Sequence, residues 1–137
     1  MKSSDNRFEV VQHNYDEIRM GSPLFGQLEI RGSSFGILPG EFAEPVAFSP
    51  DSRFLAAAEL VTTIPGPAGR VVVFDFQRGV PIIVHSFTGL ARRFSWEPDG
   101  ALTATTWSHL AGEDTRRVWS PPPPQPPKQS WWKRIFQ

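Results

Sequence analysis

Residues 45–79 read PVAFSPDSRFLAAAELVTTIPGPAGRVVVFDFQRG, and this stretch gives the clearest indication of the fold. The segment S-P-D-S is a turn, because Pro50 presets φ and Asp51 can accept hydrogen bonds from the backbone just downstream. The two prolines and two glycines of 62–69 predict a loop. The apolar runs on either side are rich in β-branched and aromatic residues, which favour strands. The expected strands are 46–48, 54–61 and 70–76.

The rest of the chain carries the same signals. Residues 24–31 alternate, with Leu28 and Ile30 on one face and Glu29 and Arg31 on the other. The polar segment 13–17 is turn-prone. Further strands are expected at 7–12, 35–38, 80–87, 92–96, 101–107 and 116–119. We therefore expect an all-β fold, an antiparallel meander that forms an open twisted sheet or a small sandwich.

Residues 48–56, FSPDSRFLA, resemble the F-S-P-D-G-x-x-L-A signature of WD40-like and PD40-type β-propeller blades. Phe74 and Asp75 then stand where such blades place a Trp-Asp pair. A second copy follows at 94–104, with two extra residues after Phe94 and Ser95, and with Trp119 at the tryptophan position. The copies start about one blade length apart. Closed propellers need ~4–8 blades, so the resemblance implies an incomplete, propeller-like arrangement.

These observations predict the domain organisation. A single all-β domain spans 1–120, with a first meander at 7–38 and blade-like repeats at 45–87 and 91–120. Residues 121–130 form a polyproline spacer. Residues 131–137 contain two tryptophans beside Ile135 and Phe136, which predicts that this segment docks on an apolar surface of the chain or of a partner.

The composition excludes several classes of function. Fourteen basic and fourteen acidic residues give zero net charge, so nothing predicts nucleic-acid binding. The chain has no cysteine, which excludes disulfides and thiolate sites. The N-terminal residues have no apolar signal sequence, and no apolar stretch of the sequence is long enough to span a membrane as a helix. We expect a cytoplasmic protein.

No catalytic or metal-binding pattern is recognised. The three histidines, His13, His85 and His109, are far apart and lack neighbours with ligand spacing. Ser49 and Ser95 lack the glycines of a nucleophile elbow. Asp51 and Asp99 belong to repeated turns, where a short acceptor is structural. We expect no metal, no cofactor and no enzymatic activity.

The function expected is that of a protein-binding module. Its concrete form is an immunity-type protein that neutralises a cognate bacterial toxin; the alternative is a subunit of a larger, propeller-like oligomer. Candidate partner-binding residues are the aromatic and charged groups Trp107, His109, Glu113, Asp114, Arg116, Trp131, Trp132 and Arg134. The predicted core is Phe48, Phe54, Leu55, Val72, Phe74, Ile82, Val84, Phe94, Leu102 and Trp119.

Overall fold

The computed structural model describes residues 1–17, 24–62, 68–108 and 113–121, and every regular element in them is a strand. The strands are β1 (Glu9–Glu17), β2 (Leu24–Arg31), β3 (Gly36–Ile37), β4 (Glu41–Phe48), β5 (Phe54–Thr62), β6 (Ala68–Asp75), β7 (Val80–Thr88), β8 (Leu90–Trp96), β9 (Leu102–Ser108) and β10 (Glu113–Trp119).

Two antiparallel sheets make up the fold. The 7-stranded sheet has the order β1-β2-β4-β5-β6-β7, with β3 paired to β2, and the 3-stranded sheet has the order β10-β9-β8. Successive strands are mostly neighbours, as tight turns require. The larger sheet is open, with β1 and β7 at its edges. The predicted all-β, antiparallel fold class is confirmed.

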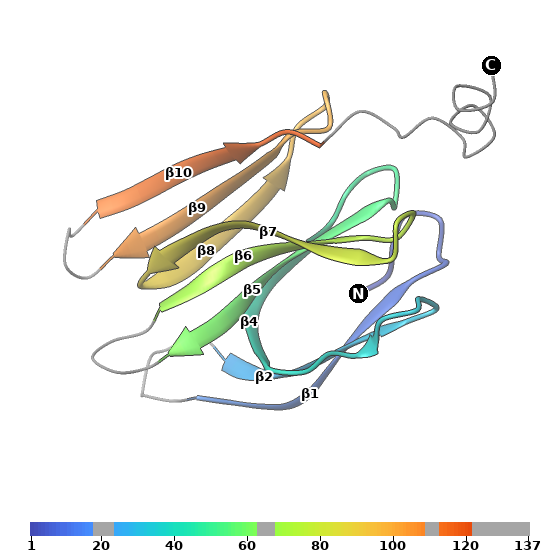
Figure 1. Cartoon of the computed structure of the whole chain (residues 1–137), viewed down its shortest axis with the longest axis horizontal. Helices are drawn as coiled ribbons and strands as arrows, with labels where there is room; N and C mark the ends of the chain where they lie inside the picture. The colour runs from blue at the N-terminus through green and yellow to red at the C-terminus, as the bar shows by residue number, and fades with distance from the viewer. Residues whose placement is uncertain (18–23, 63–67, 109–112, 122–137) are drawn as a thin grey trace, which may run out of the picture.

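Strands β5 and β6 are buried on both faces. On one face, Ala56 and Val73 pack with Phe94 and Leu102 of the 3-stranded sheet. On the other face, the neighbouring positions of β5 and β6 pack with Val10, Leu28 and Ile30. Figure 1 shows the corresponding layers: β8 to β10 lie on one side of β4 to β7, and β1 and β2 lie on the other. Residues that alternate along β5 and β6 therefore belong to two different cores.

Most of the predicted core lies inside. Six of the residues are buried: Phe54, Leu55, Val72, Phe74, Phe94 and Leu102. The other four are partly buried and pack against one of the two clusters: Phe48, Ile82, Val84 and Trp119.

The turn that follows β4 is held by a fixed set of hydrogen bonds. Ser49 Oγ donates to Asp51 Oδ1 (2.6 Å) and accepts from the backbone N–H of Phe54 (2.9 Å). The N–H of Arg53 donates to the same Asp51 oxygen (3.1 Å). The N–H of Ser52 donates to the carbonyl of Ser49 (3.0 Å), and Ser52 has a φ of 60°. Serine and aspartate thus replace backbone partners in this turn.

The same turn occurs at the start of the chain. Ser3 Oγ donates to Asp5 Oδ1 (2.7 Å) and accepts from the N–H of Phe8 (3.1 Å), while the N–H of Arg7 donates to Asp5 Oδ1 (3.1 Å). Asn6 has a φ of 59°. This copy, S-S-D-N-R-F, was not predicted from the sequence, although it corresponds to S-P-D-S-R-F position by position.

A third turn, at 97–101, corrects the alignment of the last copy. The N–H of Gly100 donates to the carbonyl of Glu97 (2.9 Å), and the N–H of Ala101 donates to Asp99 Oδ1 (3.0 Å). Glu97 therefore takes the place of Ser49 in this turn. Ser95 lies inside β8, so the two extra residues expected after Phe94 and Ser95 are not an insertion in the turn. We call residues 1–38, 39–88 and 89–121 repeats 1, 2 and 3.

Two local predictions were wrong. Residues 13–17 were expected to turn, but they continue β1, with a register shift between His13 and Asp16. Strand β4 begins at Glu41, five residues before the predicted start, and its register shifts between Ala43 and Val46. Pro45 lies within this shift, where the ladder does not need its missing N–H.

The corrected alignment predicts different effects for two serines. Ser49→Ala should lower the free energy of unfolding by about 1–3 kcal/mol, because it leaves the buried N–H of Phe54 without a partner. Ser95→Ala, the control, should change it by less than about 0.5 kcal/mol. Urea titration measures both, and equal effects would contradict the alignment.

Candidate functional site

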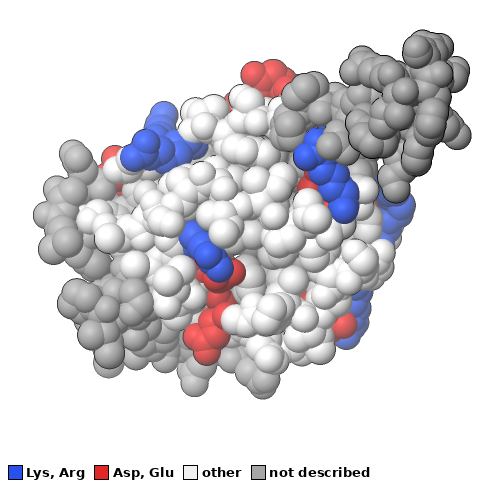
Figure 2. Space-filling model, in the orientation of Figure 1, with Lys and Arg blue, Asp and Glu red and all other residues white. Residues whose placement is uncertain are grey.

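Charged side chains are dispersed over the visible surface. Figure 2 shows basic and acidic residues scattered among uncharged ones, singly or in small groups. In the described part of the chain, no three His, Asp or Glu residues cluster as metal ligands would. A search of the same residues for a helix long and apolar enough to cross a membrane finds none.

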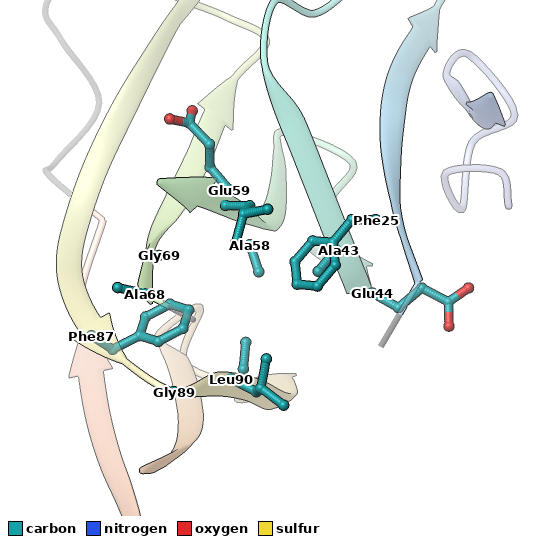
Figure 3. A pocket seen from close by; sticks show the side chains of 12 residues that line it. Phe25, Ala43, Glu44, Ala58, Glu59, Ala68, Gly69, Phe87, Gly89 and Leu90 are labelled. Carbon is teal, nitrogen blue, oxygen red and sulfur yellow. The ribbon is translucent and has the colours of Figure 1, made fainter. Parts of the chain in front are cut away.

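A shallow hollow of about 240 Å³, which includes space open to solvent, lies where the two sheets meet. Its lining is mainly apolar and comes from β2 and from β4 to β8, as Figure 3 shows. The carboxylates of Glu44 and Glu59 turn away from its centre. Arg70 Nε donates to Glu59 Oε1 at 2.9 Å, so this carboxylate is already paired. The hollow therefore lacks converging polar groups.

A buried ionic cluster holds the turn between β6 and β7. The side chain of Asp75 is fully buried, and its Oδ1 accepts from the backbone N–H groups of Gln77 (3.0 Å) and Arg78 (3.3 Å). Its other oxygen accepts from Arg53 at 3.3 Å, and the Arg53 guanidinium lies over the Phe54 ring. Both carboxylate oxygens of Asp75 are enclosed and paired, which gives Asp75 a structural role, whereas Arg53 Nε has no hydrogen-bond partner among the described residues.

The side chain of His85 on β7 is half-buried, and its two ring nitrogens are enclosed. Neither Nδ1 nor Nε2 has a hydrogen-bond partner among the described residues, and both atoms are out of contact with solvent. Burial lowers the pKa of His85, and the positive charge of Arg117 on β10 lowers it further. An imidazole that cannot reach solvent or a partner is poorly placed for proton transfer.

Among the described residues, the 3-stranded sheet is covered on one face only. Leu102, Ala104 and Phe94 are buried against repeat 2. The pairing of β8, β9 and β10 places the intervening residues together on the opposite side. We call this side the outer face of repeat 3; its rows are Ser95–Thr103–Val118, Arg93–Thr105–Arg116 and Trp107–Asp114. Leu90 pairs with Trp107, but its side chain packs against the core between the sheets.

An arginine inserted between two strand positions organises one end of this face. Arg92 lies at the register shift between Ala91 and Arg93. Its Nε is 3.4 Å from Asp114 Oδ1, and its guanidinium carbon is 5.6 Å from the centre of the Trp107 ring. A guanidinium held over an indole and paired with a carboxylate forms a preorganised contact surface.

The structure brings together three of the predicted partner-binding residues. Trp107, Asp114 and Arg116 all lie on the outer face of repeat 3. The backbone of Glu113 pairs with Ser108 in β10. The remaining candidates lie outside the described residues: His109, Trp131, Trp132 and Arg134.

Other residues of the face were not predicted as binding residues. Arg92, Arg93, Thr105 and Val118 are not among the candidate residues selected from the sequence. Val118 is 69% exposed. The signal available in the sequence was the alternation of β9, in which every second residue from Thr103 to Trp107 is on one face.

Comparison with family models finds no match, and neither the curated proteins nor the solved structures contain a match to this chain.

Removal of the buried carboxylate at Asp75 should be strongly destabilising. Asp75→Ala leaves the mostly buried Arg53 without its partner, and we expect a loss of about 3–5 kcal/mol in the free energy of unfolding. The matched control, Asp99→Ala, removes an exposed turn acceptor and should cost about 0.5–1.5 kcal/mol. Chemical denaturation compares the two, and similar losses would contradict the structural role.

His85 should make the protein less stable as the pH falls from about 7 to 5.5. In this range the unfolded state takes up a proton on His85 that the folded state resists, because the folded pKa is lowered. The free energy of unfolding should therefore decrease toward acid, and His85→Gln should flatten the dependence. His13→Gln is the control and should retain the acid loss that His85 causes. An unchanged slope in His85→Gln would contradict this assignment.

Proposed function

We propose that this chain is a non-enzymatic protein-binding module and that its interaction surface is the outer face of repeat 3. The observation that carries the proposal is the one-sided burial of the 3-stranded sheet. One face contributes Leu102 and Ala104 to the core, whereas the other presents three strands of side chains to solvent. A sheet face of this kind can accept a second protein layer, as in face-to-face packing.

The composition of this face suits a protein partner. Arginine and tryptophan are enriched at protein interfaces and dominate their binding energy. Trp107 is already stacked with Arg92, so little conformational entropy is lost when it is covered. Arg93 and Arg116 have no ion pair within the part of the chain that the structure describes. They are available to a partner's carboxylates.

We propose a non-enzymatic role because the candidate polar groups are not arranged for catalysis. The hollow between the sheets is mainly apolar, and its two carboxylates turn away from it. Asp75 is enclosed by its arginines, and the His85 ring nitrogens are out of reach of solvent. These groups lack the mutual contact that a nucleophile and a base require.

Photo-crosslinking in the cells that make the protein tests this proposal. A photoreactive phenylalanine analogue in place of Thr105 should give discrete adducts. The same analogue in place of Gln77, an exposed residue of the β6–β7 turn, is the control and should give none.

Arg116→Glu should lower the adduct yield at position 105 at least about tenfold, equivalent to 1.4 kcal/mol of binding energy. Mass spectrometry identifies the attached chain. Equal adducts at both positions, or none at position 105, would refute the outer face as the binding surface.

A further inference from the structure

The three repeats use equivalent faces to contact one another. The pairs Lys2–Glu9, Phe48–Leu55 and Trp96–Leu102 close equivalent hairpins, which makes Glu9, Leu55 and Leu102 corresponding positions. The hairpin loop has six residues in repeats 1 and 2 and five in repeat 3, so strand pairing, not residue counting, sets the equivalence.

Successive repeats then pack in the same order. The Leu55 side of repeat 2 covers Val10 and Ile30 of repeat 1. The Leu102 side of repeat 3 covers Phe54 and Ala56 of repeat 2. Each interface thus has the same order. The face of the later repeat that contains Leu55 or Leu102 packs on the face of the earlier repeat that does not contain the corresponding residue, Glu9 or Leu55.

Aromatic contacts repeat in the same way. Phe8 of repeat 1 stacks on Phe76 of repeat 2, with ring centres 4.0 Å apart. Phe54, which corresponds to Phe8, packs on Trp96 (5.8 Å) and Trp119 (5.5 Å) of repeat 3. The two interfaces within the chain therefore use the same pair of packing faces in the same direction, although β2 and β4 also join repeats 1 and 2 in one sheet.

Within the described parts of the chain, this order leaves one face uncovered at each end. At one end is the outer face of repeat 3, described above. At the other end, the Glu9 side of repeat 1 faces away from repeat 2, and we call it the outer face of repeat 1. Its residues are paired across β1, β2 and β3: Glu9–Arg31, Val11–Glu29–Ile37 and His13–Gln27.

The two end faces are complementary in charge and both include exposed apolar side chains. On repeat 1, the carboxylates of Glu9 and Glu29 share one guanidinium, that of Arg31, at 3.7 and 3.4 Å. On repeat 3, the outer face has three guanidinium groups, those of Arg92, Arg93 and Arg116, and the carboxylate of Asp114 pairs with Arg92 alone, at 3.4 Å. Ile37 is 58% exposed and lies beside Glu29, as Val118 lies beside Thr103.

We propose that the partner at the outer face of repeat 3 is the outer face of repeat 1 in a second copy of this chain. This inference rests on the proposed protein-binding role of the same face. The interface continues the order in which repeat 2 packs on repeat 1 and repeat 3 on repeat 2. Such front-to-back contacts form a closed ring when the rotation closes.

Two copies complete the ring. Closed rings of blade-like sheets contain ~4–8 units. The described residues of one chain hold three, so two chains give six and three chains exceed the range. The dimer then has two identical interfaces, each formed by repeat 3 of one copy and repeat 1 of the other.

Light scattering during size-exclusion chromatography tests the stoichiometry. The full chain should elute with twice its mass of 15.4 kDa. Arg116→Glu and Glu29→Lys, one on each face, should each raise the dimer dissociation constant at least about tenfold. Thermal melts verify that each variant folds. Ile37→Asp, which has no ion pair to lose, should weaken the dimer to a similar degree.

Mixing the two charge variants is the decisive experiment. In a mixed ring, the reversed Arg116 position of one chain meets the reversed Glu29 position of the other, and the second interface is unaltered. Equimolar mixing should therefore restore the dimer. A monomeric wild-type chain, a dimer that neither variant weakens, a mixture that stays monomeric, or a mass that keeps growing with concentration would each overturn the proposal.

The outcome is distinguishable from failure of the proposed function. A monomeric chain that still forms adducts with a different protein from position 105 would overturn the second copy as the partner and keep the binding role. Loss of the adducts altogether would overturn both.

Discussion

Burial of β5 and β6 on both faces is the constraint on which the rest of the structure depends. Their residues are apolar in continuous runs, A-A-A in β5 and V-V-V-F in β6, so neither face can be left in water. Repeat 1 covers one face and repeat 3 covers the other. The outer repeats need only one apolar face each, which explains why their strands alternate and why each exposes a polar face.

Hydrogen bonds at the turns and at Trp96 connect each repeat to the next. Ser4 Oγ donates to the carbonyl of Pro50 at 2.8 Å, and the backbone N–H of Asp5 donates to Ser52 Oγ at 3.3 Å. Equivalent turns of repeats 1 and 2 thus contact each other directly. Trp96 Nε1 links repeat 3 to the Ala47 carbonyl at 3.0 Å. These directional hydrogen bonds therefore fix the position of each repeat relative to its neighbour, which non-directional apolar contacts alone would not do.

The candidate site was only partly predictable. Trp107, Asp114 and Arg116 were selected for their residue types, and strand pairing places them on one face. Arg92 was not selected, because its contact with Trp107 depends on the register shift after Ala91, which no local pattern indicates. The first copy of the turn was visible as S-S-D-N-R-F, but it lacks the proline of the signature.

The sequence by itself determined the strands, the turns and the all-β class. These depend on interactions between near neighbours: alternation within a strand, and short side chains such as Asp51 that bind the backbone two residues on. Only the tertiary structure decided which faces are covered. That choice depends on strand register, and a loop one residue shorter in repeat 3 moves Leu102 and Ala104 to the buried side and leaves Thr103, Thr105 and Trp107 outside. The exposed face that we propose as a binding surface is therefore a consequence of long-range packing.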